Sequence, residues 1–331
     1  MFALPPPGDD TSQDRIRLAD WIEINLLSRE EEIMSVDSVT AELSGDPPDD
    51  ADDSEFRSPS EDPANPNGQL RPGFWIVSED STVDAFGELS RRAGWLRDQY
   101  PVNVGHDSAQ LNDSAASQDI YRFLVLLRAR QLYPNALEDD GEVSGLLFEE
   151  LTKWAFGAYV GARPDSQVRF GVAGGSRGDG LPQPLAQAVQ ELGRRTREPT
   201  GQVPTAGVGD YKADAVVWKP FGDQVPGQLA LIGQATITEG DWEEEEIPAR
   251  WTDRNPRQSR LINWRARPVT AVAFPETLDL TPRARLEGMQ MPGIPFDRLR
   301  LLSVLDGQIF PPQLTEQMRQ WGDDMVNRIP K

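Results

Sequence analysis

The stretch that most constrains the fold of this chain is 208–242, VGDYKADAVVWKPFGDQVPGQLALIGQATITEGDW. From Lys212 to Trp218 the residues alternate with the two-residue period of a strand, which places Lys212 and Asp214 on one face. A turn rich in proline and glycine follows, and the run LALIGQAT continues the extended pattern with Gln234 and Thr236 on one face. The stretch therefore predicts a hairpin of two buried strands that carries two candidate metal ligands, Asp214 and Gln234.

A helix precedes this hairpin in the sequence. The segment GLLFEELTKWAFGAYVG predicts a helix from about Ser144 to Gly161 that carries Glu149. With Asp214 in KADAVVW and Gln234 in GQAT, it resembles the PD-(D/E)xK restriction-endonuclease-like superfamily over roughly Gly145–Trp242. The core of that superfamily is a helix bearing Glu, a strand bearing Asp, and a second strand bearing (E/Q)xK, with Gln typical of its Mrr-like branch. Thr236 stands where the catalytic lysine of the motif is expected.

This resemblance implies a hard divalent cation, Mg²⁺ or Mn²⁺, held by Glu149, Asp214 and the amide oxygen of Gln234. Such cations take oxygen ligands and leave room for a substrate phosphate. Two lysines could replace the missing catalytic lysine in activating water. Lys212 lies on the strand face of Asp214, and Lys153 lies one helical turn beyond Glu149. The alternatives are a solvated strand edge for Lys212 and a surface ion pair with Glu149 for Lys153.

Other catalytic chemistries are excluded by composition. The chain has no cysteine, which removes disulfides, thiolate nucleophiles, Cys-ligated zinc and iron–sulfur clusters. Its one histidine, His106, lies in the loop-like stretch YPVNVGHDS and is more simply a surface residue than a general base. A Ser–His–Asp triad cannot be assembled without His106. Phosphoryl-transfer or hydrolytic chemistry with an oxygen-ligated metal is among the few enzyme classes that remain.

The net charge of −21 opposes a role in nucleic-acid binding, since phosphate contacts come from Lys and Arg. The charge is unevenly distributed. Residues 1–120 hold 26 Asp and Glu against 8 Lys and Arg, whereas residues 121–331 hold 28 against 25. The part that carries the motif is therefore nearly neutral. The acidic excess elsewhere is read first as a solubility feature, with salt adaptation or mimicry of polyanions as alternatives.

The best candidate contact for nucleic acid is the segment 250–267, RWTDRNPRQSRLINWRAR. It holds two tryptophans and one acidic residue among six arginines: Arg250, Arg254, Arg257, Arg260, Arg265 and Arg267. Arginine pairs bidentately with phosphate and tryptophan offers a stacking face. The alternative is that Arg250, Arg254 and Arg257 merely neutralise Glu243–Glu246 in a helix.

The chain divides into five predicted parts: an N-terminal helical segment (1–43), an acidic disordered linker or insertion (44–72), a helical part packing on the core (73–140), the nuclease-like core (141–310) and a C-terminal helix (311–331). The first helix is expected to extend to about Met34. In the third part the helical spacing of Val83, Phe86 and Leu89 turns Arg91, Arg92 and Arg97 outward.

The predicted fold class is α/β, a restriction-endonuclease-like mixed sheet flanked by helices, with a mainly helical acidic N-terminal part. No apolar run reaches the length needed to span a bilayer and no secretory signal is visible, so we expect a cytoplasmic protein without membrane contact.

The function implied by the resemblance is a Mg²⁺-dependent DNA endonuclease, or a nuclease-like subunit, of a bacterial restriction or anti-phage defence system with partner protein subunits. A rival hypothesis is a catalytically inactive subunit that binds DNA or acts as a protein scaffold, which Thr236 favours. A hydrolase of another phosphorylated substrate is a third.

Overall fold

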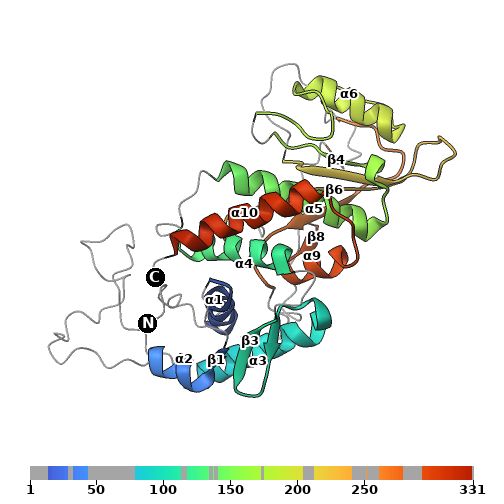
Figure 1. The fold of residues 1–331 in the computed structure, drawn as a ribbon. Helices are drawn as coiled ribbons and strands as arrows, with labels where there is room; N and C mark the ends of the chain where they lie inside the picture. The colour runs from blue at the N-terminus through green and yellow to red at the C-terminus, as the bar shows by residue number, and fades with distance from the viewer. Residues whose placement is uncertain are drawn as a thin grey trace, which may run out of the picture. The chain divides into compact units, whose positions relative to one another are not determined.

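The computed structural model describes residues 14–28, 33–43, 79–112, 118–133, 137, 141–172, 175–203, 212–240, 251, 261–278 and 293–329. Within them the protein is mixed α/β, with eight α-helices and two sheets of three and five strands (Figure 1). The chain divides into two compact units, one formed by residues 1–115 with 327–331 and the other by residues 116–326.

The first unit contains three helices, a short 3-10 helix and a three-stranded sheet: α1 (Asp14–Ser28), β1 (Ile33–Ser35), α2 (Val36–Leu43), α3 (Glu79–Leu96), η3 (Arg97–Gln99), β2 (Val102–Val104) and β3 (Ser108–Leu111). The sheet is antiparallel with the order β1-β3-β2. His106 lies in the connection between β2 and β3, with its side chain 95% exposed, as a surface residue would be.

Two predictions for this unit are wrong. The first helix does not extend to Met34, because α1 ends at Ser28 and Met34 belongs to β1, where it pairs with Ala109. Arg92 does not point outward, because its side chain is fully buried. Ala85, Leu89, Arg92 and Leu96 share one buried stripe of α3, which is rotated from the stripe that Val83 suggests. Val83 itself is 52% exposed.

The second unit contains five helices, a 3-10 helix and five strands: α4 (Gln118–Leu132), α5 (Glu142–Val160), η4 (Pro164–Ser166), β4 (Gln167–Arg169), α6 (Leu185–Thr196), β5 (Ala215–Lys219), β6 (Leu229–Ala235), β7 (Val269–Ala273), β8 (Ile294–Phe296), α9 (Arg298–Leu305) and α10 (Pro312–Arg328). The predicted helix around Glu149, the predicted hairpin and the predicted C-terminal helix are all present.

The sheet of this unit is mixed, with the order β4-β5-β6-β7-β8. The first three strands pair antiparallel, and β6, β7 and β8 pair parallel. Ala215 pairs with Gly233 and Lys219 with Leu229, so β5 and β6 form the predicted hairpin. The predicted α/β class with a mixed sheet is confirmed.

Both faces of the hairpin are covered, which is why its strands are apolar almost throughout. One face packs in a core with α6 that includes Val216, Ile232 and Leu192. The other face carries α5. A Cβ at Gly233 would lie 2.1 Å from the ring of Phe156, so only glycine lets α5 approach β6 this closely.

The predicted acidic linker or insertion at 44–72 lies outside the described residues, as does the acidic run of residues 241–246. Among the described residues, no helix is long and apolar enough to cross a membrane.

Candidate active site

The candidate site lies where β5 begins and β6 ends, beneath α5. Asp214 immediately precedes β5 and is held there by the backbone of both neighbouring strands. Its carbonyl oxygen accepts hydrogen bonds from the N–H groups of Phe170 (2.7 Å) and Gly171 (3.2 Å), and its own N–H donates to the carbonyl of Gly233 (2.9 Å). The carboxylate oxygen Oδ2 accepts from the N–H of Ala235 at 2.8 Å. These backbone hydrogen bonds give Asp214 a defined position.

Glu149 on α5 reaches the same point. A Cβ at Gly171 would lie 2.9 Å from Oδ1 of Asp214 and 3.0 Å from Oε2 of Glu149. The two carboxylate oxygens are therefore separated by no more than the sum of these distances, about 6 Å. The space that they share exists because residue 171 has no side chain. Two oxygen ligands of one Mg²⁺ lie ~2.0–2.1 Å from the ion and therefore within ~4 Å of each other. A small rotation of the Asp214 or Glu149 side chain would bring their oxygens to that separation.

Gln234 is the neighbour of Asp214 across the hairpin. Because Ala215 pairs with Gly233, the preceding residue Asp214 comes next to Gln234 on β6. The amide oxygen Oε1 of Gln234 is buried and has no hydrogen-bond partner in the part of the chain that the structure describes. A buried acceptor without a partner costs about 1–3 kcal/mol, so this oxygen suits a bound cation or water.

The set of possible metal ligands is therefore two carboxylates and one amide. Within the described ranges, no group of three or more His, Cys, Asp or Glu side chains is arranged to hold a metal ion. The donors that fit a hard divalent cation are the oxygens of Glu149 and Asp214, and the unpartnered amide oxygen of Gln234 on the neighbouring strand is a third candidate. An octahedral metal bound by these three residues would keep about half of its coordination positions for water and substrate.

Arg169 is the residue of this site that the sequence analysis missed. Its guanidinium is 3.2 Å from Oε2 of Glu149 and 2.9 Å from Oε1 of Glu150, and its side chain is only 5% exposed. In QVRF, Val168 and Phe170 face the core with α6, so the two-residue period of β4 turns Arg169 to the face that carries α5. That alternation is a signal that would have identified it.

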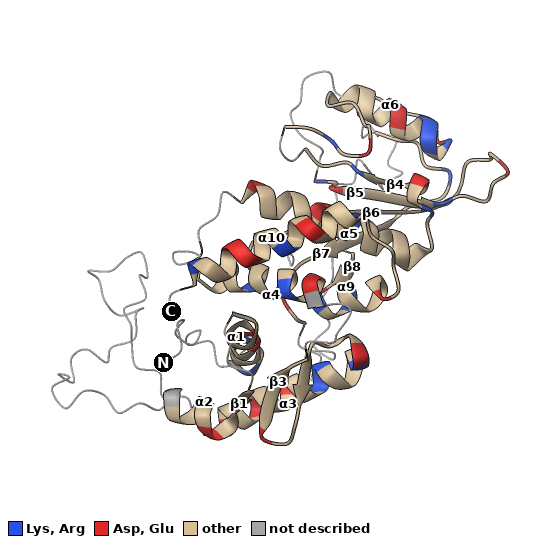
Figure 2. Ribbon diagram, viewed as in Figure 1, with Lys and Arg blue, Asp and Glu red and all other residues tan. Residues whose placement is uncertain are grey.

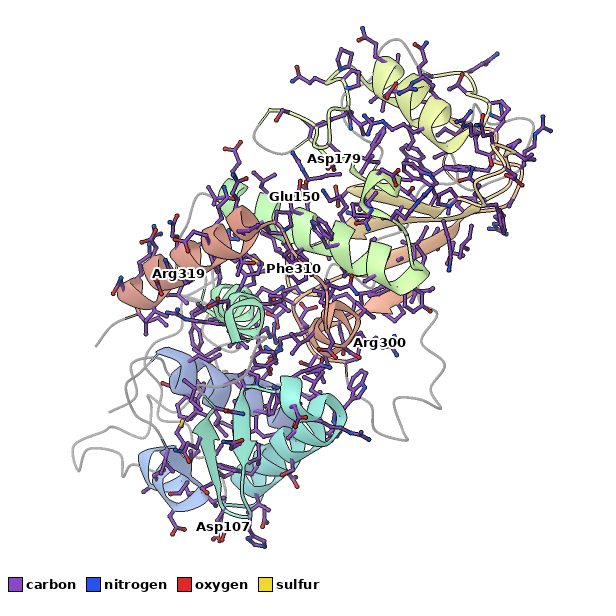
Figure 3. The ribbon with its side chains drawn as sticks, turned by 45° about the vertical axis from the view of Figure 1, so that its right-hand side comes forward. Asp107, Glu150, Asp179, Arg300, Phe310 and Arg319 are labelled. Carbon is purple, nitrogen blue, oxygen red and sulfur yellow. The ribbon has the colours of Figure 1, made fainter. Side chains whose placement is uncertain are left out.

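Lys153 does not pair with Glu149. Its ammonium contacts both carboxylate oxygens of Asp179, at 3.0 and 2.9 Å, and Oε2 of Glu150 at 2.7 Å. Asp179 also accepts the backbone N–H of Arg169 at 2.7 Å. Figure 3 labels Glu150 on α5 and Asp179 on the glycine-rich loop after β4. The hydrogen bonds of Asp179 with Lys153 and Arg169 hold the loop beside α5 and β4.

The prediction that Lys212 shares a strand face with Asp214 is wrong. The strand begins only at Ala215, and Lys212 lies in a bend with φ of 59°, outside the extended region. The alternation of side chains therefore does not continue back to Lys212, which is exposed. Thr236 is 7% exposed and donates its backbone N–H to the carbonyl of Ala273 at 3.0 Å.

Arg265 and Arg267 lie at the other end of the sheet. They precede β7, which runs parallel to β6 with Val269 beside Leu231. A Cβ at Gly227 would lie 3.6 Å from Cβ of Arg265, and Gly227 precedes Gln234 by seven residues. At ~3.3 Å per residue this end of the hairpin is roughly 20 Å from the candidate site. Both arginines are exposed.

The rest of the arginine-rich segment is only partly visible. Arg250, Arg254, Arg257 and Arg260 lie outside the described residues. Trp251 does not offer a stacking face, because it is 1% exposed and packs edge-on against Phe170 with ring centroids 5.0 Å apart.

Comparisons with known proteins identify no relative: no protein-family model, no curated protein and no solved structure matches this chain.

Proposed function

We propose that this chain is a metal-dependent phosphodiesterase of the restriction-endonuclease-like type that acts on DNA. The order of the parts supports this proposal: Glu149 is carried by a helix, Asp214 by the start of the next central strand, and Gln234 by the strand paired with it. That is the order of acidic and amide residues in the PD-(D/E)xK motif, and a mixed sheet with antiparallel and parallel strands surrounds it.

The observation that carries the proposal is the meeting of Asp214 Oδ1 and Glu149 Oε2 in the space left by Gly171. Two carboxylates from different elements point at one position, and the backbone N–H of Ala235 orients the first of them. Arg169 already pairs with Oε2 of Glu149 at 3.2 Å, and a divalent cation between the two carboxylates would compensate more of their negative charge. Mg²⁺ or Mn²⁺ bound there would polarise a phosphoryl oxygen and lower the pKa of a water molecule.

The chain's own residues then have defined tasks. Asp214, Glu149 and the amide of Gln234 hold the cation, and Arg169 limits the negative charge that builds up around Glu149 and Glu150. Lys153 and Lys212 remain the candidates for orienting the attacking water in the absence of a lysine at Thr236. Lys153 brings an ammonium that is buried beside Glu150 and Asp179, whereas Lys212 brings an exposed one.

The experiment is cleavage of linear and supercoiled DNA by the purified full chain with Mg²⁺ or Mn²⁺, with EDTA as the metal-free reaction. Asp214→Ala and Glu149→Gln are expected to abolish cutting, while Asp165→Ala, an aspartate that is 74% exposed away from the site, is expected to cut normally. Mn²⁺ binding by calorimetry without DNA gives a second readout. Equal cutting by wild type and Asp214→Ala would reject the assignment.

A second function is favoured by a specific observation. The motif lysine is replaced by Thr236, and the guanidinium of Arg169 already lies 3.2 Å from Glu149. A catalytically inactive subunit that keeps the fold to bind DNA or a partner protein would show these features. It predicts DNA or protein binding that is unchanged by EDTA, with no cutting at any metal concentration.

The cellular setting follows from the same resemblance. A restriction or anti-phage defence system of the cytoplasm, with partner subunits that control the nuclease, is the context in which we place the chain.

A further inference from the structure

The connection between β5 and β6 carries exposed apolar side chains at the end of the hairpin far from Asp214. Phe221 is 77% exposed, Val225 55% and Leu229 45%. Figure 1 shows this connection projecting beyond the strands that it joins. A large aromatic side chain so exposed at a loop tip has few contacts to stabilise the fold, which points to a partner.

The tip (Pro220–Gly227) is nevertheless held in one shape. Oδ1 of Asp223 accepts the N–H of Val225 at 3.0 Å. Glu198, which is 4% exposed, accepts the N–H groups of Gly227 at 2.7 Å and Arg265 at 3.0 Å. One buried carboxylate therefore ties the tip to the end of α6 and to the segment before β7. A tip held this way loses little conformational entropy when it binds.

Exposed cations surround the base of this hairpin. On the α6 side, Arg197 donates to Oε1 of Gln224 at 3.3 Å, and Arg265 lies beside Gly227 with Arg267 two residues further. On the α5 side, Nζ of Lys219 lies 3.2 Å from the Cβ position of Gly161. Figure 2 shows basic residues at the base of the hairpin and an acidic one at its tip, where the sequence has Asp223. In a chain with a net charge of −21, four cations around one projecting aromatic are a local exception.

We propose that this hairpin binds duplex DNA, with the ring of Phe221 placed against a base step and with Arg197, Lys219, Arg265 and Arg267 on the phosphates beside it. The inference rests on the proposed function for its class of substrate. Apolar wedges inserted between base steps, with cations on the flanking backbone, are a general way to hold a duplex.

The position of the wedge sets the size of the binding site. It lies roughly 20 Å from Asp214 along the hairpin, since strands advance ~3.3 Å per residue. A duplex that touches both places therefore spans roughly six base pairs at ~3.4 Å per step.

The test is the affinity of the full chain for a labelled duplex, measured by fluorescence anisotropy in EDTA at several salt concentrations. Phe221→Ala is expected to weaken binding about 5- to 100-fold, as loss of an aromatic–base contact does, and Phe221→Trp to retain it. The triple variant Lys219→Ala, Arg265→Ala, Arg267→Ala is expected to reduce the slope of log affinity against log salt by about 2–3. Ile309→Ala, 89% exposed, and Arg319→Ala on α10 are the matched controls and are expected to bind normally.

The outcomes separate this inference from the proposed function because binding is measured without metal. Wild-type DNA binding that is insensitive to Phe221→Ala and to the triple variant overturns the wedge and leaves the nuclease standing. Binding that depends on the hairpin, in a protein that cuts no DNA with Mg²⁺ or Mn²⁺, supports the wedge and rejects the nuclease. If the wild-type protein binds no duplex in EDTA, the wedge is overturned. The nuclease proposal then depends only on the cleavage assay with Mg²⁺ or Mn²⁺.

Discussion

Each of the two units holds a buried arginine among carboxylates, and the two clusters differ in how closed they are. In the first unit Arg92 is fully buried and contacts Asp20 (2.9 Å), Glu23 (2.8 Å) and Glu88 (3.0 Å). In the second unit Arg169 contacts two carboxylates, and these partners, Glu149 and Glu150, keep 15% and 24% of their side chains exposed. The carboxylates around Arg92 are therefore closed to solvent, whereas those around Arg169 are partly accessible to it.

The comparison teaches that the number of charges does not distinguish a structural cluster from a functional one. Around Arg92, Tyr100 donates its hydroxyl to Glu23, and all these groups are buried. Around Arg169, Oδ1 of Asp214 lies close to Glu149 at Gly171, and the neighbouring strand carries Gln234, whose buried Oε1 has no hydrogen-bond partner among the described residues. Partial exposure and an unsatisfied oxygen are what mark the second cluster as a site.

The largest effect is expected from Arg92→Met. Removing this guanidinium leaves Asp20, Glu23 and Glu88 buried without their cation, and loss of one partner from a buried ion pair costs about 3–5 kcal/mol. Urea denaturation followed by circular dichroism measures the loss.

Arg169→Met is the matched variant in the other unit. It is expected to lower the free energy of unfolding by only about 1–3 kcal/mol, because water reaches Glu149 and Glu150. Mn²⁺ affinity is expected to rise about 3- to 10-fold, since a competing positive charge has gone. Equal destabilisation by the two variants, with unchanged Mn²⁺ binding, would mean that the clusters are alike.

Gly171→Ala is expected to have a smaller effect on the free energy of unfolding but a large effect on metal binding at the site. The new methyl group would lie 2.9 Å from Oδ1 of Asp214 and 3.0 Å from Oε2 of Glu149, so the carboxylates must move apart. We expect Mn²⁺ affinity, measured by calorimetry, to fall at least about 10-fold, which corresponds to ~1.4 kcal/mol.

Gly145→Ala in α5 is the control for that variant. Nothing lies within 4 Å of its Cβ position, so alanine is expected to stabilise the helix by about 0.5–1 kcal/mol and to leave Mn²⁺ binding unchanged. Normal metal binding by Gly171→Ala would remove the central argument for the site.

The smallest effect concerns pH. Burial raises the pKa of Glu88, but hydrogen bonds and charges from Arg91 and Arg92 outweigh it, and the net result is a pKa below the ordinary 4.5. A lowered pKa in the folded state contributes stability that is present above pH 4.5 and is lost as the pH falls through the lowered value. In Glu88→Gln, the free energy of unfolding is expected to fall less steeply as the pH is lowered. Urea denaturation between about pH 3 and 6, a range that brackets the ordinary carboxyl pKa, measures this dependence. An acid limb of unchanged slope would show that Glu88 does not contribute.

The local pattern of the sequence was enough to predict most of the elements of the second unit. Alternation and turn residues predicted the hairpin of β5 and β6, and helical spacing predicted α5, α6 and α10, because these signals depend only on neighbours along the chain. Since Asp214 and Gln234 lie on two strands joined by a short turn, local information also indicated that they would be close.

What only the tertiary structure decided is which charged residues are buried and with whom. Helical spacing led to the wrong prediction that Arg92 faces outward from α3, because the carboxylates of α1 that bind Arg92 are about seventy residues away in the sequence. The same is true of Arg169, whose partners lie on α5, and of Lys153, which binds Asp179 rather than the nearer Glu149. Burial of a charge requires partners from several elements at once, and no single stretch of sequence contains that information. The sequence by itself therefore determined the strands and helices that carry Glu149, Asp214 and Gln234, while the approach of Glu149 to Asp214 at Gly171 was decided by the packing of α5 on the sheet.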